Sequence, residues 1–64
     1  MHMQIQADDF IEYVDELIEK REFDKAKWTL EDHPYVKSLI NVYGYSKLDE
    51  LKSKLARAVD MDTL

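Results

Sequence analysis

The segment Glu31-Asp32-His33 holds the residue types in this sequence that come closest to metal or acid–base chemistry. Successive helical side chains point about 100° apart, so these three would not converge on one metal ion. The chain has no cysteine, and no serine forms a plausible catalytic triad with His33. Asp60 and Asp62 are too few ligands for a calcium loop. We therefore predict that the protein is not an enzyme and has no catalytic residue, cofactor or metal.

The composition indicates one small domain over residues 1–64, with 45% apolar residues, 36% charged residues and a net charge of −5. The absence of cysteine excludes disulfides and fits the cytoplasmic location that we predict. No apolar run is long enough to cross a membrane, and residues 1–7 lack the pattern of a signal peptide. Because so small a core gains stability by oligomerising, we also predict a homodimer.

Apolar residues recur at helical spacing in four segments, which predicts an all-α fold, a compact bundle of four short helices. The predicted helices cover residues 9–20, 22–32, 34–43 and 47–59. Pro34 is favoured at the first position of a helix, and Gly44 can adopt the left-handed conformation that ends many helices. Residues 1–7 are expected to form an extended arm or, at Met1-His2, a cloning scar. Residues 60–64 are expected to be a frayed tail.

The apolar faces of the four segments predict one core. Its expected members are Phe10, Ile11, Val14, Leu17, Ile18, Phe23, Ala26, Leu30, Val36, Leu39, Ile40, Tyr43, Leu48, Leu51, Leu55 and Val59. Trp28 does not belong to this face, because helical spacing places it about 140° from Phe23. A large aromatic residue outside the core suggests a contact with a partner protein.

The candidate partner-binding residues are Trp28, Tyr35, Val42 and Tyr45. Tyr35 and Tyr45 flank the third helix, which has an unusually wide apolar face, and could form an aromatic patch with Val42. Two other interpretations remain open. Trp28 would instead cover a neighbouring helix, and the third helix would instead be the buried centre of one subunit.

Charge is divided unevenly along the chain: residues 7–32 have a net charge of −6, whereas residues 33–57 have a net charge of +3. The acidic face of the first helix consists of Asp8, Glu12, Asp15, Glu16 and Glu19. This face suggests a basic partner or, as one alternative, mimicry of a nucleic acid through residues 8–24.

A helix-turn-helix-like segment over residues 36–59 suggests a second alternative, a DNA-binding regulator. Its candidate DNA contacts are Lys47, Lys52, Lys54 and Arg57. Asp49 and Glu50 argue against this alternative, because they occupy the first turn of the helix that would face DNA phosphates. The preferred hypothesis is therefore an acidic protein–protein interaction module that acts as a regulator, inhibitor or accessory subunit.

Overall fold

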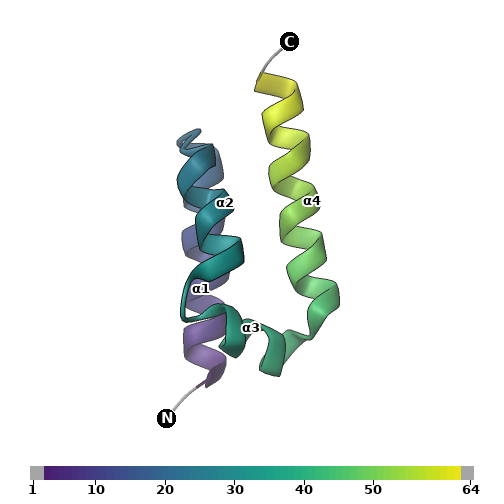
Figure 1. Cartoon of the computed structure of the whole chain (residues 1–64). Coiled ribbons are helices and arrows are strands. Elements are labelled where there is room, and N and C mark those ends of the chain that lie inside the picture. Colours follow the sequence, from purple (N-terminus) through teal and green to yellow (C-terminus); the bar gives the residue numbers. More distant parts are fainter. Residues whose placement is uncertain (1–2, 63–64) are drawn as a thin grey trace.

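Four helices account for almost all of residues 3–62, the part of the chain that the computed structural model describes. They are α1 (Met3–Glu19), α2 (Phe23–Asp32), α3 (Val36–Tyr43) and α4 (Tyr45–Asp62) (Figure 1). No strand occurs within residues 3–62. The predicted all-α fold with four helices is confirmed.

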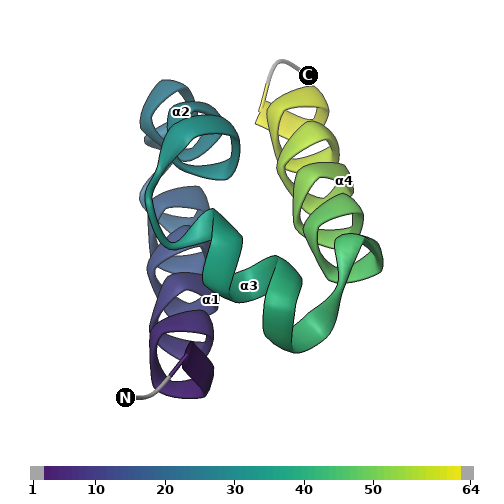
Figure 2. The same cartoon turned by 60° about the horizontal axis from the view of Figure 1, so that its bottom comes forward.

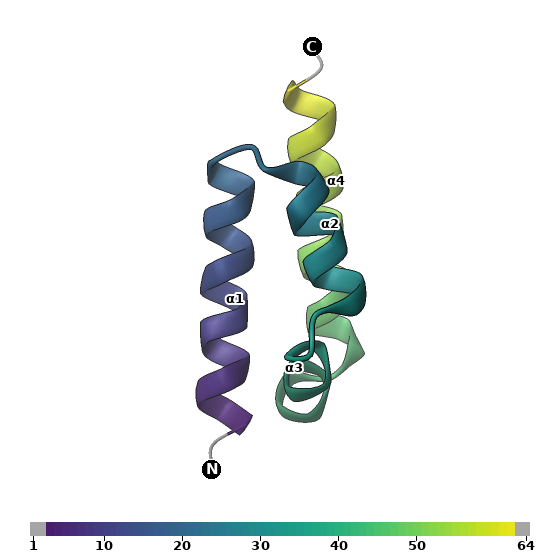
Figure 3. The ribbon, with the colours of Figure 1, turned by 60° about the vertical axis from the view of Figure 1, so that its left-hand side comes forward.

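The helices form an elongated bundle with extents of 42 × 19 × 16 Å. Helices α1 and α2 lie side by side and run in opposite directions (Figure 3). Helix α3 then crosses the bundle at the end where α1 begins, and α4 runs back beside α2 (Figure 2). The most extensive interface is between α1 and α3, so the short third helix is the element that holds the first one in place.

The core lies between all four helices and contains most of the predicted residues. Its buried members are Phe10, Val14, Leu17, Ile18, Ala26, Leu30, Leu39, Leu48, Leu51 and Leu55. Ile11, Phe23, Val36, Ile40 and Val59 are partly buried against it. The prediction was wrong for Tyr43, which is 40% exposed. The helical spacing places its ring on the apolar side of α3, but that side extends beyond the area that α1 and α4 cover.

The extended arm predicted for residues 1–7 is wrong where the structure describes it, because α1 begins at Met3. Ala7 is completely buried, and it lies three residues before Phe10 on the same helical face. The Ser38 hydroxyl donates a hydrogen bond of 2.7 Å to the side-chain oxygen of Gln6. Contacts with α3 therefore extend the first helix six residues before its predicted start. Met1-His2 lies outside the described residues.

Helix α1 ends in a Schellman turn that carries an arginine at its left-handed position. Arg21 has φ of 62°. The backbone N–H groups of Arg21 and Glu22 donate to the carbonyl oxygens of Ile18 and Leu17, at 3.0 and 2.9 Å. This pair of bonds defines the motif, in which glycine is the usual left-handed residue. The tight turn brings α2 back along α1.

The last two helices are joined by one residue, so α4 begins at Tyr45 rather than at the predicted position 47. Gly44 has φ of 82° and ψ of 174°, a region that glycine almost alone adopts. Its N–H donates to the carbonyl oxygen of Ile40 at 2.8 Å. The tail prediction for residues 60–64 is also wrong as far as Asp62, which is the last residue of α4. Residues 63–64 lie outside the described part of the chain.

Candidate functional site

An aromatic cluster, defined here as Phe10, Tyr13, Trp28, His33 and Tyr35, lies where α1, α2 and the α2–α3 turn meet. The His33 ring is at its centre. The distances from the His33 ring centroid are 5.6 Å to Phe10, 6.2 Å to Tyr13, 5.9 Å to Trp28 and 5.2 Å to Tyr35. Trp28 and Tyr35 both approach His33 edge to face, an arrangement that aromatic rings favour. The cluster thus links the core to the surface through one imidazole ring.

Exposure rises steeply across the aromatic cluster. Phe10 is 1% exposed, whereas Trp28 is 52% exposed and Tyr35 is 38% exposed. Trp28 has this position because it lies on the side of α2 away from the buried Ala26 and Leu30. The indole and the His33 ring meet edge to face, and about half of the Trp28 surface is exposed to solvent. The two interpretations of Trp28 are therefore not exclusive: it lies beside neighbouring rings and also offers a large apolar surface.

The extended backbone before Pro34 directs the side chain of His33 into the aromatic cluster. His33 is extended, with φ of −63° and ψ of 139°, as expected for a residue that precedes proline. Its Nδ1 accepts a hydrogen bond of 3.1 Å from the backbone N–H of Tyr35. An accepting Nδ1 means that the neutral ring carries its proton on Nε2. This bond also explains why α3 starts at Val36, because it holds the backbone N–H of Tyr35, the residue just before that helix. The predicted start at residue 34 was two residues too early.

The structure brings together two of the four predicted partner-binding residues. Trp28 and Tyr35 both contact His33, whereas Val42 and Tyr45 lie at the opposite end of α3. Tyr35 directly precedes α3, and Val42 lies seven residues further along, which corresponds to a rise of about 10 Å. Val42 is partly buried, and Tyr45 is 69% exposed. No local sequence pattern placed His33 at the centre of the site.

Tyr43 joins the end of α3 to the start of α1. Its hydroxyl donates a hydrogen bond to the carboxylate of Asp8. This hydrogen bond, together with desolvation and the negative charge of Asp8, raises the pKa of Tyr43 above its ordinary value. The bond crosses the interface between α1 and α3. This interface stabilises the N-terminal residues of α1, which lie before the predicted start of the helix.

Three of the five acids on the predicted acidic face have partners within the chain. Asp8 accepts the bond from Tyr43, Asp15 pairs with Lys54 at 2.7 Å, and Glu16 pairs with Lys20 at 2.9 Å. Glu12 and Glu19 are exposed on the same side of α1. The ion pairs weaken the negative electrostatic potential that a nucleic-acid mimic would need, because each one brings a positive charge next to a carboxylate.

The four basic residues of α4 do not form one continuous basic surface. Lys47 pairs with Glu50 at 3.1 Å and Lys54 pairs with Asp15, whereas Lys52 lines a groove on another side of α4. Arg57 lies near Lys54, beside the contact between α1 and α4. A DNA-binding helix-turn-helix has a turn of three to four residues, but only Gly44 connects α3 and α4.

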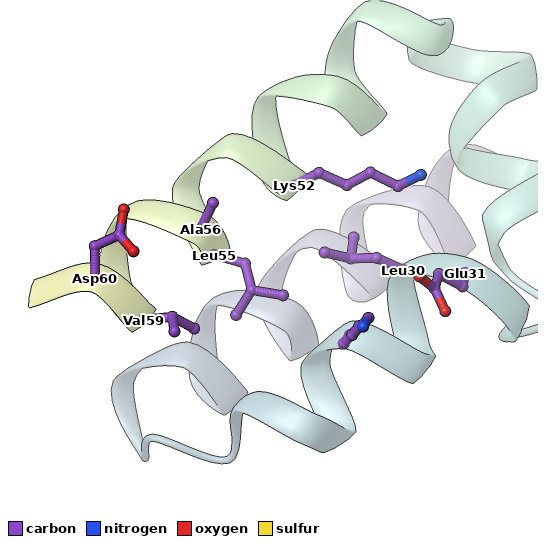
Figure 4. A pocket seen from close by; sticks show the side chains of 8 residues that line it. Leu30, Glu31, Lys52, Leu55, Ala56, Val59 and Asp60 are labelled. Carbon is purple, nitrogen blue, oxygen red and sulfur yellow. The ribbon is translucent and has the colours of Figure 1, made fainter. Parts of the chain in front are cut away.

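A shallow groove of about 390 Å³, which no sequence pattern predicted, runs between α2 and α4 (Figure 4). Its lining residues are Lys27, Leu30, Glu31, Lys52, Leu55, Ala56, Val59 and Asp60. Leucine and valine side chains form the floor, and charged side chains of both signs form the ends. The sequence feature that could have indicated the groove is the four-residue spacing of Lys52, Ala56 and Asp60 on an exposed side of α4.

Within residues 3–62, no group of three histidine, aspartate or glutamate side chains could hold a metal ion. No helix in that range is both long enough and apolar enough to span a membrane. No family model, curated protein or solved structure matches the chain. The aromatic cluster, the groove and the distribution of charge are therefore the features that bear on function.

Proposed function

We propose that this protein is a cytoplasmic, non-catalytic regulator, inhibitor or accessory subunit that binds a basic segment of another protein through its aromatic cluster. The observation that carries the proposal is Trp28, which is half exposed yet supported by His33. Tryptophan is enriched among the residues that dominate binding energy. A ring already held in place loses little conformational freedom when a partner covers it.

The surroundings of Trp28 favour a positively charged partner. Asp24 and Asp32 lie one helical turn before and after Trp28 on the same exposed side of α2. An arginine side chain can stack on an indole ring while it donates hydrogen bonds to a neighbouring carboxylate. Residues 7–32, which include α2 and most of α1, have a net charge of −6. This charge would also increase the rate of association with a basic segment.

The first test compares proteins captured from cells by the wild-type chain, by Trp28→Ala and by Tyr45→Ala. Tyr45 is the matched control because it is an exposed aromatic residue outside the aromatic cluster. We expect Trp28→Ala to lose at least tenfold of a specific captured protein, which corresponds to about 1.4 kcal/mol. Tyr45→Ala should retain it. Far-UV circular dichroism checks that each variant remains helical.

The charge requirement is tested on the captured protein with Asp24→Asn and Asp32→Asn. Each change removes a carboxylate beside Trp28 and leaves the indole in place, so each should weaken binding and reduce its dependence on salt. Trp28 is the only tryptophan in the chain, so its fluorescence reports directly on whether the partner covers this ring. Unchanged capture by a folded Trp28→Ala variant would refute the proposed function.

A further inference from the structure

The exposed side of α4 that borders the groove has a symmetric arrangement of charge. Lys52, Ala56 and Asp60 follow one another at intervals of four residues, and all three are exposed. Residues four apart lie on the same side of a helix. The alanine is therefore the midpoint between a positive and a negative side chain, and these three residues border the same groove (Figure 4).

This arrangement is complementary to itself. If a two-fold axis passes beside Ala56, a second α4 runs antiparallel to the first. Lys52 of each copy then lies opposite Asp60 of the other, which forms two equivalent ion pairs. Ala56 faces its own counterpart at the axis, where a small side chain lets two helices approach closely. Asp60 has an interaction within its own chain, and its carboxylate has lone pairs for a second donor.

The charges on α2 agree with the same arrangement. Because α2 runs opposite to α4, Glu31 lies toward the Lys52 end of the groove and Lys27 toward the Asp60 end. When the two grooves face each other, α2 also lies antiparallel to α2 of the second copy. Glu31 of each copy then lies opposite Lys27 of the other. Positive and negative side chains alternate around both ends of the resulting bundle of four helices.

We propose that a second copy of this chain docks on the groove between α2 and α4, with the two α4 helices antiparallel and crossing at Ala56. Leu30 and Leu55 form the floor of the groove and are themselves buried, so the apolar surface that the dimer covers belongs to Ala56 and Val59. A standard interface takes about 800 Å² from each partner. This is less than a fifth of the 4589 Å² of accessible surface of the chain. The groove contains no residue of the aromatic cluster, so this proposal and the proposed function fail independently.

The charge pairing is tested with Lys52→Glu and Asp60→Lys. Each variant alone places like charges opposite each other in the dimer, so each should sediment as a monomer. An equimolar mixture restores opposite charges at both contacts, so it should form a heterodimer. The wild-type chain should sediment as a dimer at high micromolar concentration. Lys25→Glu and Glu12→Lys are controls with the same charge changes on exposed positions outside the groove, and both should stay dimeric.

The position of the axis is tested by a single introduced cysteine, since the chain has none of its own. Ala56→Cys places two thiols next to each other across the axis and should give an interchain disulfide under mild oxidation. Asp49→Cys is the control on the same side of α4. Its counterpart in the dimer would lie about 21 Å away along the helices. Asp49→Cys should therefore remain unlinked at the same chain concentration.

Three results would overturn the proposal. They are a wild-type chain that is monomeric at high micromolar concentration, a mixture of Lys52→Glu and Asp60→Lys that does not associate, and equal disulfide formation by Ala56→Cys and Asp49→Cys. Ala56→Arg provides a check that does not depend on charge pairing. This position is exposed, so the variant should keep its helical circular dichroism and become monomeric.

Discussion

Tyr43 shows at the scale of one residue how a surface hydrogen bond can hold two helices together. Its phenol is on the exposed end of α3, and the carboxylate of Asp8 accepts the bond from α1. The bond requires the phenol proton, which is why the pKa of Tyr43 lies above its ordinary value of 10.0. The stabilisation is therefore fully present below pH 10 and disappears as the pH rises through the raised pKa.

We predict that the phenol of Tyr43 loses its proton above its ordinary pKa of 10.0. The measurement is tyrosinate absorbance against pH. Tyr43→Phe should remove the late phase, and Asp8→Asn should move it toward the ordinary pKa because the acceptor loses its charge. The hydrogen bond that Lys20 donates to Glu16 raises the pKa of Lys20 as well. Absorbance is therefore the appropriate readout, because it detects phenols and not ammonium groups. A Tyr43→Phe variant that keeps the late phase of the wild-type absorbance curve would contradict this prediction.

The aromatic cluster was only partly predictable from single residues. Helical spacing correctly placed Trp28 away from the buried face, because that argument needs only the local period. The central place of His33 depends on an extended backbone before Pro34 and on a ring of α1 that lies twenty-three residues earlier, Phe10. Neither the direction of that extended residue nor its packing partner is encoded in a local pattern.

At the scale of elements, the existence of four helices was predictable and their ends were not. The ends depend on contacts between residues far apart in sequence, such as Ser38 with Gln6 and Tyr43 with Asp8. These contacts make α1 begin at Met3, where the sequence shows only a short alternation of apolar and polar residues. Gly44 was predicted to end α3, but its conformation also allows α4 to begin at the next residue.

Replacement of Gly44 should destabilise the connection between α3 and α4. No atom lies within 4 Å of where a Cβ at position 44 would be, so the cost of Gly44→Ala comes from the backbone and not from a clash. A non-glycine residue in this conformation costs about 1–3 kcal/mol. Chemical denaturation should therefore show a fall in the free energy of unfolding of that size.

D-alanine at position 44 is the matched control, and a chain of 64 residues is accessible to chemical synthesis. A D-residue adopts positive φ without strain, because its allowed regions mirror those of an L-residue. We expect the D-alanine chain to be at least as stable as the wild type. If L-alanine and D-alanine at position 44 destabilise the chain equally, the connection requires the absence of a Cβ atom rather than a residue that tolerates positive φ.

At the scale of the whole molecule, the single chain is more extended than its length requires. Its radius of gyration is 11.5 Å, whereas a compact domain of 64 residues has about 10.7 Å. The long dimension of 42 Å follows the axes of α1, α2 and α4 (Figure 1), and α3 bridges α2 and α4 at only one end of the groove between them (Figure 2). A second copy in the groove would complete a bundle of four antiparallel helices, the packing arrangement that suits helices of this kind.

Stability should therefore increase with protein concentration. At a concentration about one hundred times the dissociation constant, a second copy adds about 2.7 kcal/mol to the folded state. Each kcal/mol raises the Tm of a domain this small by about 4–8 °C. Melting followed by circular dichroism should shift upward across a hundredfold dilution series of the wild type. Ala56→Arg should melt at one temperature throughout the series, because a monomer gains nothing from concentration. A wild-type Tm that is equally independent of concentration would mean that the four helices of one chain are stable without a second copy.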